Sequence, residues 1–446
     1  MTYFLGLLIS LASGFLLIRL LTDGRLNLML HMLLALALGF GIDGTAAFYT
    51  HIFLNQPDRW FPVGIVLLGA MILFFRIKGT QYLIPRIKYC VPLIRIPTFW
   101  GLLILGILAV PLAISAHYYP LGGWDAWSCW NLKAKFIFLG QGNWKDILAP
   151  GLWRSNTHYP LLWPLINVWF WDLGGRFDQA VPMLNSIIFA LLTSGILLFG
   201  LLELTGLLLP SILAAVIVTA LPFGITLYIS QYSDSLLGLY LLSAFMCLLL
   251  AERTKNPKLK ILGMIFLGLM CFVKNEGLIS AGVTALAFFW HERAHKKELK
   301  SLIPAFFLAA LPTIIFTLGF APKNEAFING LTSTAKPANW TRLSVILVYP
   351  WFEFISGKWN GLWFFVLGGG ILAGKKLWQG TLGVIAVSLF FYLGIVLAYY
   401  SVNTFFEISW WLQNTLSRIL FALVPTIALW IGLGVSSPPE GSKQVR

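Results

Sequence analysis

The fold class of this chain follows from residues 98–135, which read TFWGLLILGILAVPLAISAHYYPLGGWDAWSCWNLKAK. The first part, residues 98–116, is an uninterrupted apolar run that is long enough to cross a bilayer as a helix. The second part, residues 122–135, places a carboxylate, amide and ammonium groups and three indoles directly after that run. Charged groups are costly beside lipid and are kept there mainly for function. The stretch therefore predicts a membrane helix that leads into a polar site.

The composition extends this pattern to the whole chain. Of the 446 residues, 58% are hydrophobic and 11% are charged, and the mean hydropathy is +0.82. Apolar runs follow one another without room for a soluble domain, which predicts an all-α polytopic transmembrane helix bundle of about 13 spans. The net charge of +14 fits cytoplasmic loops and lipid headgroups. We therefore expect the lipid bilayer as a partner, and no nucleic acid.

Basic loops give the predicted orientation, because Lys and Arg accumulate on the cytoplasmic side of a membrane. The most basic segments are 76–95, 252–260 and 291–300. Alternation of the spans between them places the loop 117–158 outside, together with the starts of the helices at Asp234 and Lys274. The predicted location is a multi-pass protein of the cytoplasmic (inner) membrane, with its site facing the periplasm or the exterior.

Two apolar runs, 159–171 and 343–355, are too short to cross a hydrocarbon core of about 30 Å. We expect them to be re-entrant or interfacial, and we expect further interfacial helices in the first outer loop. The chain then divides into three parts. They are N-terminal spans with a basic cytoplasmic loop (1–97), a central transmembrane module that includes the outer loop 117–158 (98–320), and C-terminal spans (321–446).

Five short motifs occur in order at the predicted outer ends of spans: WDAW (124–127), NLKAK (131–135), HYPLLWPL (158–165), QYSD (231–234) and KNEGL (274–278). Their order resembles the GT-C superfamily of polytopic glycosyltransferases. More narrowly, it is similar to the bacterial relatives of protein O-mannosyltransferases and aminoarabinose transferases, which use sugars carried on polyprenyl phosphate. The resemblance covers residues 120–290 and, more loosely, 416–425.

The resemblance implies an enzyme that moves a hexosyl or pentosyl group from a polyprenyl-phosphate-linked sugar to an envelope acceptor, with inversion. It implies that Asp125 is the catalytic base or binds the acceptor, and that Asp234 is the second acid, at the start of a later helix. Many family members carry His-Pro-Pro or His-Pro-Asp-Tyr-Pro where this chain has Thr157-His158-Tyr159-Pro160. His158 is therefore the remaining catalytic candidate at that point.

The transfer also needs a cation that stabilises the phosphate as it leaves. Arg418 lies about one turn inside the last predicted helix, where its guanidinium can hold a lipid-borne phosphate. Lys274, with Glu276 beside it, offers a second positive charge. Trp124 and Tyr232 complete the candidate substrate-binding set. Acidic oxygens suit a divalent metal ion, but the spacing gives no evidence for one, and no cofactor is required.

Simpler roles compete with these assignments. Asp125 and Asp234 are favoured helix N-caps, and the tryptophans at every third position from Trp124 are typical interfacial anchors. Two other functions also stay open. One is a transporter or flippase of lipid-linked glycans, which is expected to show two-fold repeats and paired broken helices. The other is an enzyme of the O-antigen polymerase or ligase type.

Overall fold

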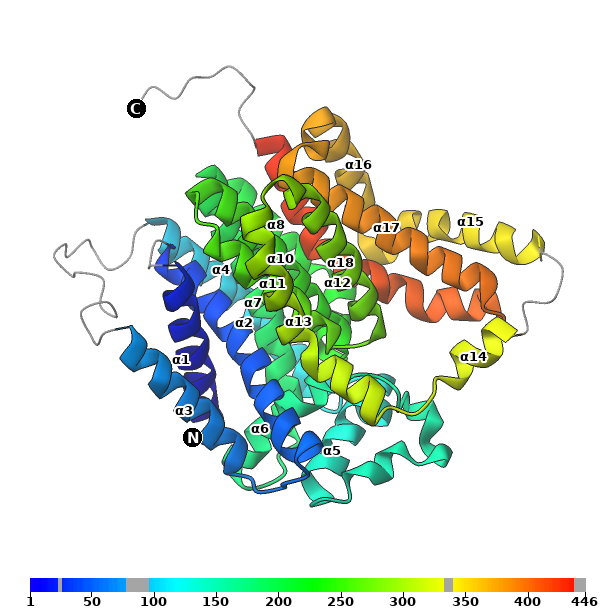
Figure 1. Cartoon of the computed structure of the whole chain (residues 1–446). Helices are drawn as coiled ribbons and strands as arrows, with labels where there is room; N and C mark the ends of the chain where they lie inside the picture. Colours follow the sequence, from blue (N-terminus) through cyan, green and yellow to red (C-terminus); the bar gives the residue numbers. More distant parts are fainter. Residues whose placement is uncertain (23–25, 78–95, 333–339, 437–446) are drawn as a thin grey trace.

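The structure is a computed structural model that describes residues 1–22, 26–77, 96–332 and 340–436. Within these residues every regular element is helical and no strand occurs, so the predicted all-α class is confirmed. Most of the predicted basic loop 76–95 and the C-terminal tail lie outside the described residues. Figure 1 shows the long helices side by side, with α14 to α17 extending to one side.

Eight helices among the described residues are long and apolar enough to cross a membrane, and they indicate a membrane protein. The helices α8 (Leu208–Ala220) and α9 (Pro222–Ile229) form a further candidate span, bent by 59°. The bend occurs next to Pro222, whose ring nitrogen cannot donate a helical hydrogen bond. The eight are α1 (Thr2–Thr22), α2 (Leu28–Ala47) with the π-helical turns Phe48–Phe53, α4 (Ile96–Tyr118), α7 (Ala180–Thr205), α10 (Ser233–Thr254), α13 (Lys296–Gly319), α17 (Gly380–Val402) and α18 (Ile408–Ser436).

The predicted count of about 13 spans is not confirmed, because several expected spans form shorter helices. The helix α11 (Lys258–Cys271) has 14 residues and α12 (Asn275–His291) has 17. At 1.5 Å per residue, they reach only about 21 and 26 Å. These lengths fall short of a hydrocarbon core of about 30 Å. The other short helices are α3 (Phe61–Arg76), α5 (Asn131–Leu139), α6 (Leu162–Gly174), α14 (Glu325–Thr332), α15 (Trp340–Ile355) and α16 (Leu362–Ala373).

The helix α10 forms the centre of the bundle. Every residue in the most apolar 18-residue part of α10 is buried, and the helix packs against α7, α11 and α18. A side chain at Gly238 of α10 would lie 2.8 Å from the carbonyl oxygen of Ala422 in α18, so glycine allows the two backbones to approach closely. One turn earlier on each helix are Asp234 and Arg418. This close approach brings their side chains together.

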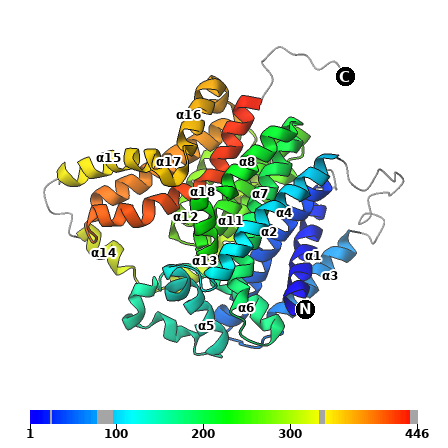
Figure 2. The ribbon, with the colours of Figure 1, turned by 180° about the vertical axis from the view of Figure 1, so that it is seen from behind.

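The first loop covers one end of the bundle. Between α4 and α6 it contains α5 and short helical turns, as the sequence predicted for a loop that carries helices. Figure 2 shows α5 and α6 at this end from behind. The N-terminal helices α1 and α2 pack against α6, and α2 also packs against α7. The N-terminal spans are therefore part of the same helical packing.

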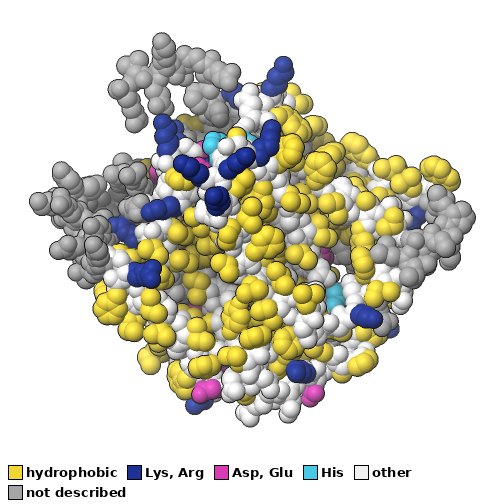
Figure 3. Space-filling view, viewed as in Figure 1, with side chains coloured by type: hydrophobic (Ala, Val, Ile, Leu, Met, Phe, Trp, Pro, Cys, Tyr) yellow, Lys and Arg dark blue, Asp and Glu magenta, His cyan; other side chains and the backbone are white. Residues whose placement is uncertain are grey.

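Charged and apolar surfaces are separated along the bundle. Figure 3 shows hydrophobic side chains over much of one face, with Lys and Arg gathered toward the end away from the first loop.

The helix α10 has 22 residues, so its ends lie about 33 Å apart, close to the thickness of a hydrocarbon core. Asp234 is at one of these ends. The exposed cations at the other end include Arg253, Lys255, Lys258, Arg293, Lys296 and Lys297.

Candidate functional site

An ion cluster lies at the first-loop end of α10, with Arg418 between two carboxylates. Nη1 of Arg418 is 2.7 Å from Oδ2 of Asp125. Nε and Nη2 donate to Oδ2 of Asp234 at 3.1 and 2.9 Å. The structure therefore brings together three predicted site residues that come from the first loop, from α10 and from α18.

Lys274 joins the same cluster from the turn between α11 and α12. Its Nζ donates to Oδ1 of Asp234 at 2.6 Å and lies 3.6 Å from Oε1 of Glu276. Both oxygens of Asp234 are thus occupied, one by each cation. Burial by itself would lower the pKa of Lys274, but Asp234 and Glu276 outweigh that effect and raise the pKa. The ammonium group therefore stays charged at neutral pH.

Exposure divides the cluster into a buried part and an open edge. The side chains of Asp234 and Lys274 are 1% and 5% exposed. The side chains of Arg418 and Asp125 are 20% and 26% exposed, and that of Glu276 is 26% exposed. Asp234 therefore acts as a buried anchor for two cations, while the side chains of Asp125 and Arg418 are partly exposed.

Aromatic residues pack around Arg418 and the start of the first loop. The guanidinium carbon of Arg418 lies 4.2 Å from the centre of the Tyr232 ring, a cation–π contact. A side chain at Gly123 would come within 2.5 Å of the Tyr232 hydroxyl, so this position requires glycine. Trp124 is 65% exposed and makes an edge contact with Trp127. Of the two predicted substrate-binding aromatics, only Tyr232 touches the cluster.

The expected row of tryptophan anchors is interrupted at Trp130. Trp124 and Trp127 are exposed, whereas Trp130 is 1% exposed and stacks on Tyr159. Lys133 is completely buried beside these two rings, and its Nζ donates to the carbonyl oxygen of Asn156 at 2.6 Å. Burial lowers the pKa of Lys133. Trp130 is thus part of the core of the loop, and only the first two tryptophans have the exposure of interfacial anchors.

His158 lies beside the cluster and makes no hydrogen bond within the described part of the chain. It contacts the ring of Tyr159, and the Tyr159 hydroxyl donates to Oε1 of Glu276 at 3.5 Å. Burial, and then the charge of Lys133, lower the pKa of His158 to about 4, so the imidazole is neutral at pH 7. The structure therefore places His158 near the site without direct contact to Asp125.

The sequence interpretation gave no role to Tyr159, and it placed Lys133 in the polar stretch 122–135 without a partner. Both belong to motifs quoted above, HYPLLWPL and NLKAK. The polar side chains in these motifs could have been recognised as candidate site residues from the sequence. Their partners could not, because the fold alone brings Lys133 to Asn156 and Tyr159 to Glu276.

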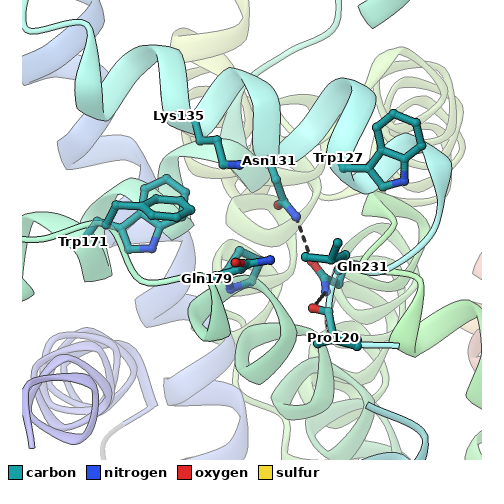
Figure 4. Close-up of a pocket in the computed structure, with 10 residues that line it drawn as sticks. Pro120, Trp127, Asn131, Lys135, Trp171, Gln179 and Gln231 are labelled. Atoms are coloured by element: carbon teal, nitrogen blue, oxygen red, sulfur yellow. Dashed lines mark hydrogen bonds between the residues drawn. The ribbon is translucent and has the colours of Figure 1, made fainter. Parts of the chain in front are cut away.

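A chain of hydrogen-bonded amides connects the two aspartate-bearing segments. Nδ2 of Asn131 donates to Oε1 of Gln231 at 2.8 Å, and Nε2 of Gln231 donates to the carbonyl oxygen of Pro120 at 3.1 Å, as Figure 4 shows. The backbone N–H of Gly123 also donates to the carbonyl oxygen of Ser230 at 3.0 Å. The chain continues toward α1 through Asn167, Asn185 and Tyr3.

Asn131 and Gln231 of this amide chain line a cavity of about 30 Å³, beside Trp127, Lys135 and Trp171. A cavity of this size holds no more than a water molecule or two. It is therefore too small for a sugar. The amides hold the loop against the start of α10, and thereby hold Asp125 and Asp234 on either side of Arg418.

The capping interpretation of the two aspartates is not supported. Asp125 precedes the π-helical turn Ala126–Trp130, but its side chain makes no capping hydrogen bond. The N-cap of α10 is Tyr232, and Asp234 lies inside the first turn. The aspartates are therefore used for ion pairs with cations from other elements.

The cluster also does not fit a shared metal ion. Among the described residues, no group of three or more His, Cys, Asp or Glu side chains is placed to hold one. Arg418 and Lys274 occupy both oxygens of Asp234. The positive charge between the acids comes from these two side chains.

Comparisons with family models, with curated proteins and with solved structures give no significant match. The resemblance of the motif order to GT-C enzymes thus stays a prediction. The function of the cluster has to be argued from its geometry and charges.

Proposed function

We propose that this chain is a membrane glycosyltransferase that moves a sugar from a polyprenyl-phosphate-linked donor to a lipid, glycan or protein acceptor, with inversion. The observation that carries the proposal is the contact between the partly exposed Asp125 and Arg418 at one end of an apolar helical bundle. Buried Asp234 and Lys274 support this contact from behind. A proton acceptor and a cation for a leaving phosphate are therefore adjacent.

The positions of the charges also support the proposed location. A group of exposed basic residues lies at the other end of α10, and the positive-inside rule assigns that end to the cytoplasm. The cluster then faces the periplasm or exterior of a multi-pass inner-membrane protein. A donor carried by a polyprenyl chain reaches such a site from within the bilayer.

The proposed reaction uses each group once. Asp125 takes the proton of the acceptor hydroxyl while that oxygen attacks C1 of the sugar. The bond between C1 and the phosphate oxygen breaks, and its electron pair leaves with the polyprenyl phosphate. Arg418 stabilises the charge on the departing phosphate. Attack opposite the leaving group inverts C1, and the proton on Asp125 then passes to water.

The charge balance of the cluster supports a donor with a single phosphate. Three carboxylates and two cations give the five residues a net charge of −1. A phosphodiester adds one negative charge, whereas a diphosphate adds more and increases the repulsion in a partly buried site. Because Arg418 and Lys274 already supply positive charge, no step of the proposal passes through a metal ion.

A transporter or flippase is less well supported. Transporters built from inverted repeats carry broken helices in corresponding positions of their two halves. Among the described residues one bent pair occurs, α8 with α9. A polymerase- or ligase-type enzyme is expected to use outer loops rich in Arg and His, whereas this site is rich in acids.

Envelope glycan profiling by mass spectrometry tests the proposal. Cells lacking the protein are compared with cells that carry wild type, Asp125→Asn or Arg418→Lys at matched protein level. We expect one defined sugar to disappear in the deletion strain and in both variants, while its polyprenyl-linked donor accumulates. If Asp125→Asn restores the glycans fully, Asp125 is not the base.

A further inference from the structure

Arg418 has two carboxylate partners that are held in different ways. Asp234 is buried, and Nε and Nη2 of Arg418 together with Nζ of Lys274 occupy its two oxygens. Asp125 is 26% exposed and meets Arg418 through Nη1 alone. Its side chain makes no other hydrogen bond among the described residues.

The two ion pairs therefore differ in how easily they exchange. Removing one member of a buried pair leaves an uncompensated charge, so the contact with Asp234 is costly to break. An exposed pair is weak, because water and salt compete with it. The Nη1 side of Arg418 is thus the side on which another anion can replace a carboxylate. A phosphate oxygen suits that position, since guanidinium groups bind phosphates and carboxylates in similar geometry.

We infer that Asp125 occupies, in the protein without donor, the position on Arg418 that a phosphate oxygen takes when the donor binds. This inference rests on the proposed function. The carboxylate of Asp125 neutralises Nη1 until the phosphate arrives, and the phosphate then releases it. The released carboxylate is free to take the acceptor's proton. Donor binding therefore comes before the base becomes available.

The backbone around Asp125 is held in place during this exchange. Gly122 adopts a positive φ of 71°, and a side chain there would lie 2.8 Å from the carbonyl oxygen of Ser230. The N–H of Gly123 donates to the same carbonyl. With the loop fixed at these two positions, the exchange requires rotation of the Asp125 side chain and no movement of the loop.

The test is a binding measurement on the purified full-length protein in detergent, with farnesyl phosphate as the probe and farnesol as the uncharged control. We expect Asp125→Asn to bind farnesyl phosphate about fivefold more tightly than wild type, because the competing carboxylate is gone. Asp125→Ala removes the same contact and serves as a second variant. Asp146→Asn, which removes an exposed acid of the same loop, should bind like wild type.

A second arm uses inorganic phosphate. Tighter binding of farnesyl phosphate than of inorganic phosphate supports a lipid-borne ligand. Equal binding of the two, with the same dependence on Asp125, supports the exchange but makes free phosphate the ligand and contradicts the lipid-linked donor.

The remaining outcomes separate the two proposals. If wild type binds farnesyl phosphate and both Asp125 variants bind it equally or more weakly, Asp125 is no competitor. The exchange is then wrong, while the proposed function stands. If no form of the protein binds farnesyl phosphate above the farnesol control, the proposed function fails and the exchange fails with it.

Discussion

Two ion clusters lie at opposite ends of the bundle, and they are built differently. At the basic end, Lys260 contacts Glu292 at 2.9 Å and Glu298 at 2.6 Å. These acids follow Lys260 by 32 and 38 positions, so the ion pairs connect the ends of the consecutive helices α11, α12 and α13. At the other end, Arg418 contacts Asp234, which precedes it by 184 positions, and also Asp125 of the first loop.

The difference is consistent with the proposal that the cluster at the basic end serves stability and the Arg418 cluster serves chemistry. Ion pairs between consecutive helices hold together the ends of those helices and have little effect elsewhere. Charges that come from the first loop, α10, α12 and α18 to one partly exposed point have no such local purpose, and ionisable groups at membrane depth are typically functional. Substitutions at matched positions of the two clusters therefore test this distinction.

The largest effect is expected for Asp125→Asn. Loss of a general base lowers the rate of transfer by about 10²- to 10⁴-fold, with little change in thermal stability because the ion pair is partly exposed. The matched control is Glu298→Gln, since Glu298 is 32% exposed and pairs with Lys260. Initial rates of sugar transfer in membrane vesicles, at equal protein level, measure both. Equal losses in the two variants would remove the distinction between the clusters.

The next effect is a loss of stability in Asp234→Asn. This substitution leaves Lys274 and Arg418 without their buried acid, and it should lower the free energy of unfolding by about 3–5 kcal/mol. Glu292→Gln at the basic end should cost less, because Lys260 keeps Glu298. Thermal unfolding of the purified proteins in detergent gives the comparison. A loss for Asp234→Asn no greater than that for Glu292→Gln would show that Asp234 is no anchor.

Gln231→Leu should lower activity by a smaller factor. It weakens the amide contacts that position the Arg418 cluster and leaves the cluster's own charges in place. Without the Gln231 side chain the first loop loses its contacts with Asn131 and Pro120. Misplacement of Asp125 should then lower kcat by about tenfold, with a smaller change in KM. Steady-state kinetics with Ser301→Ala at the basic end as the control test this. A change in KM alone would mean that Gln231 affects binding and not the position of the base.

The smallest effect concerns the acid stability of His158→Gln. The pKa of His158 in the folded protein is about 4, below the usual 6.5, so protonation between these values favours the unfolded chain. Wild type should therefore lose stability as the pH falls from about 6.5 toward 4. His158→Gln should lose about 1 kcal/mol less between pH 7 and pH 5.5. His295→Gln at the basic end, where the side chain is 64% exposed, is the control in thermal unfolding at both pH values.

Much of the site could be predicted because charged residues are scarce in this chain. With 11% charged residues, an acid or a base at the predicted outer end of an apolar run stands out, and the cost of burying charge gives it significance. Lys274, Glu276 and Arg418 were selected in this way, Asp125 and Asp234 also from the resemblance, and the structure places all five in one cluster. His158 and Trp124 were selected from their motifs alone, and neither contacts the cluster directly.

The helical class of this chain and its fit to a membrane follow from the sequence, because hydropathy is a local property of each run. The number of helices long enough to cross, and which carboxylate is buried and which is partly exposed, follow from the packing of the helices. These outcomes depend on contacts between distant elements, such as Gly238 against Ala422 and Gly123 against Tyr232. The burial of a charge is set by what packs around it, and no local pattern records that packing.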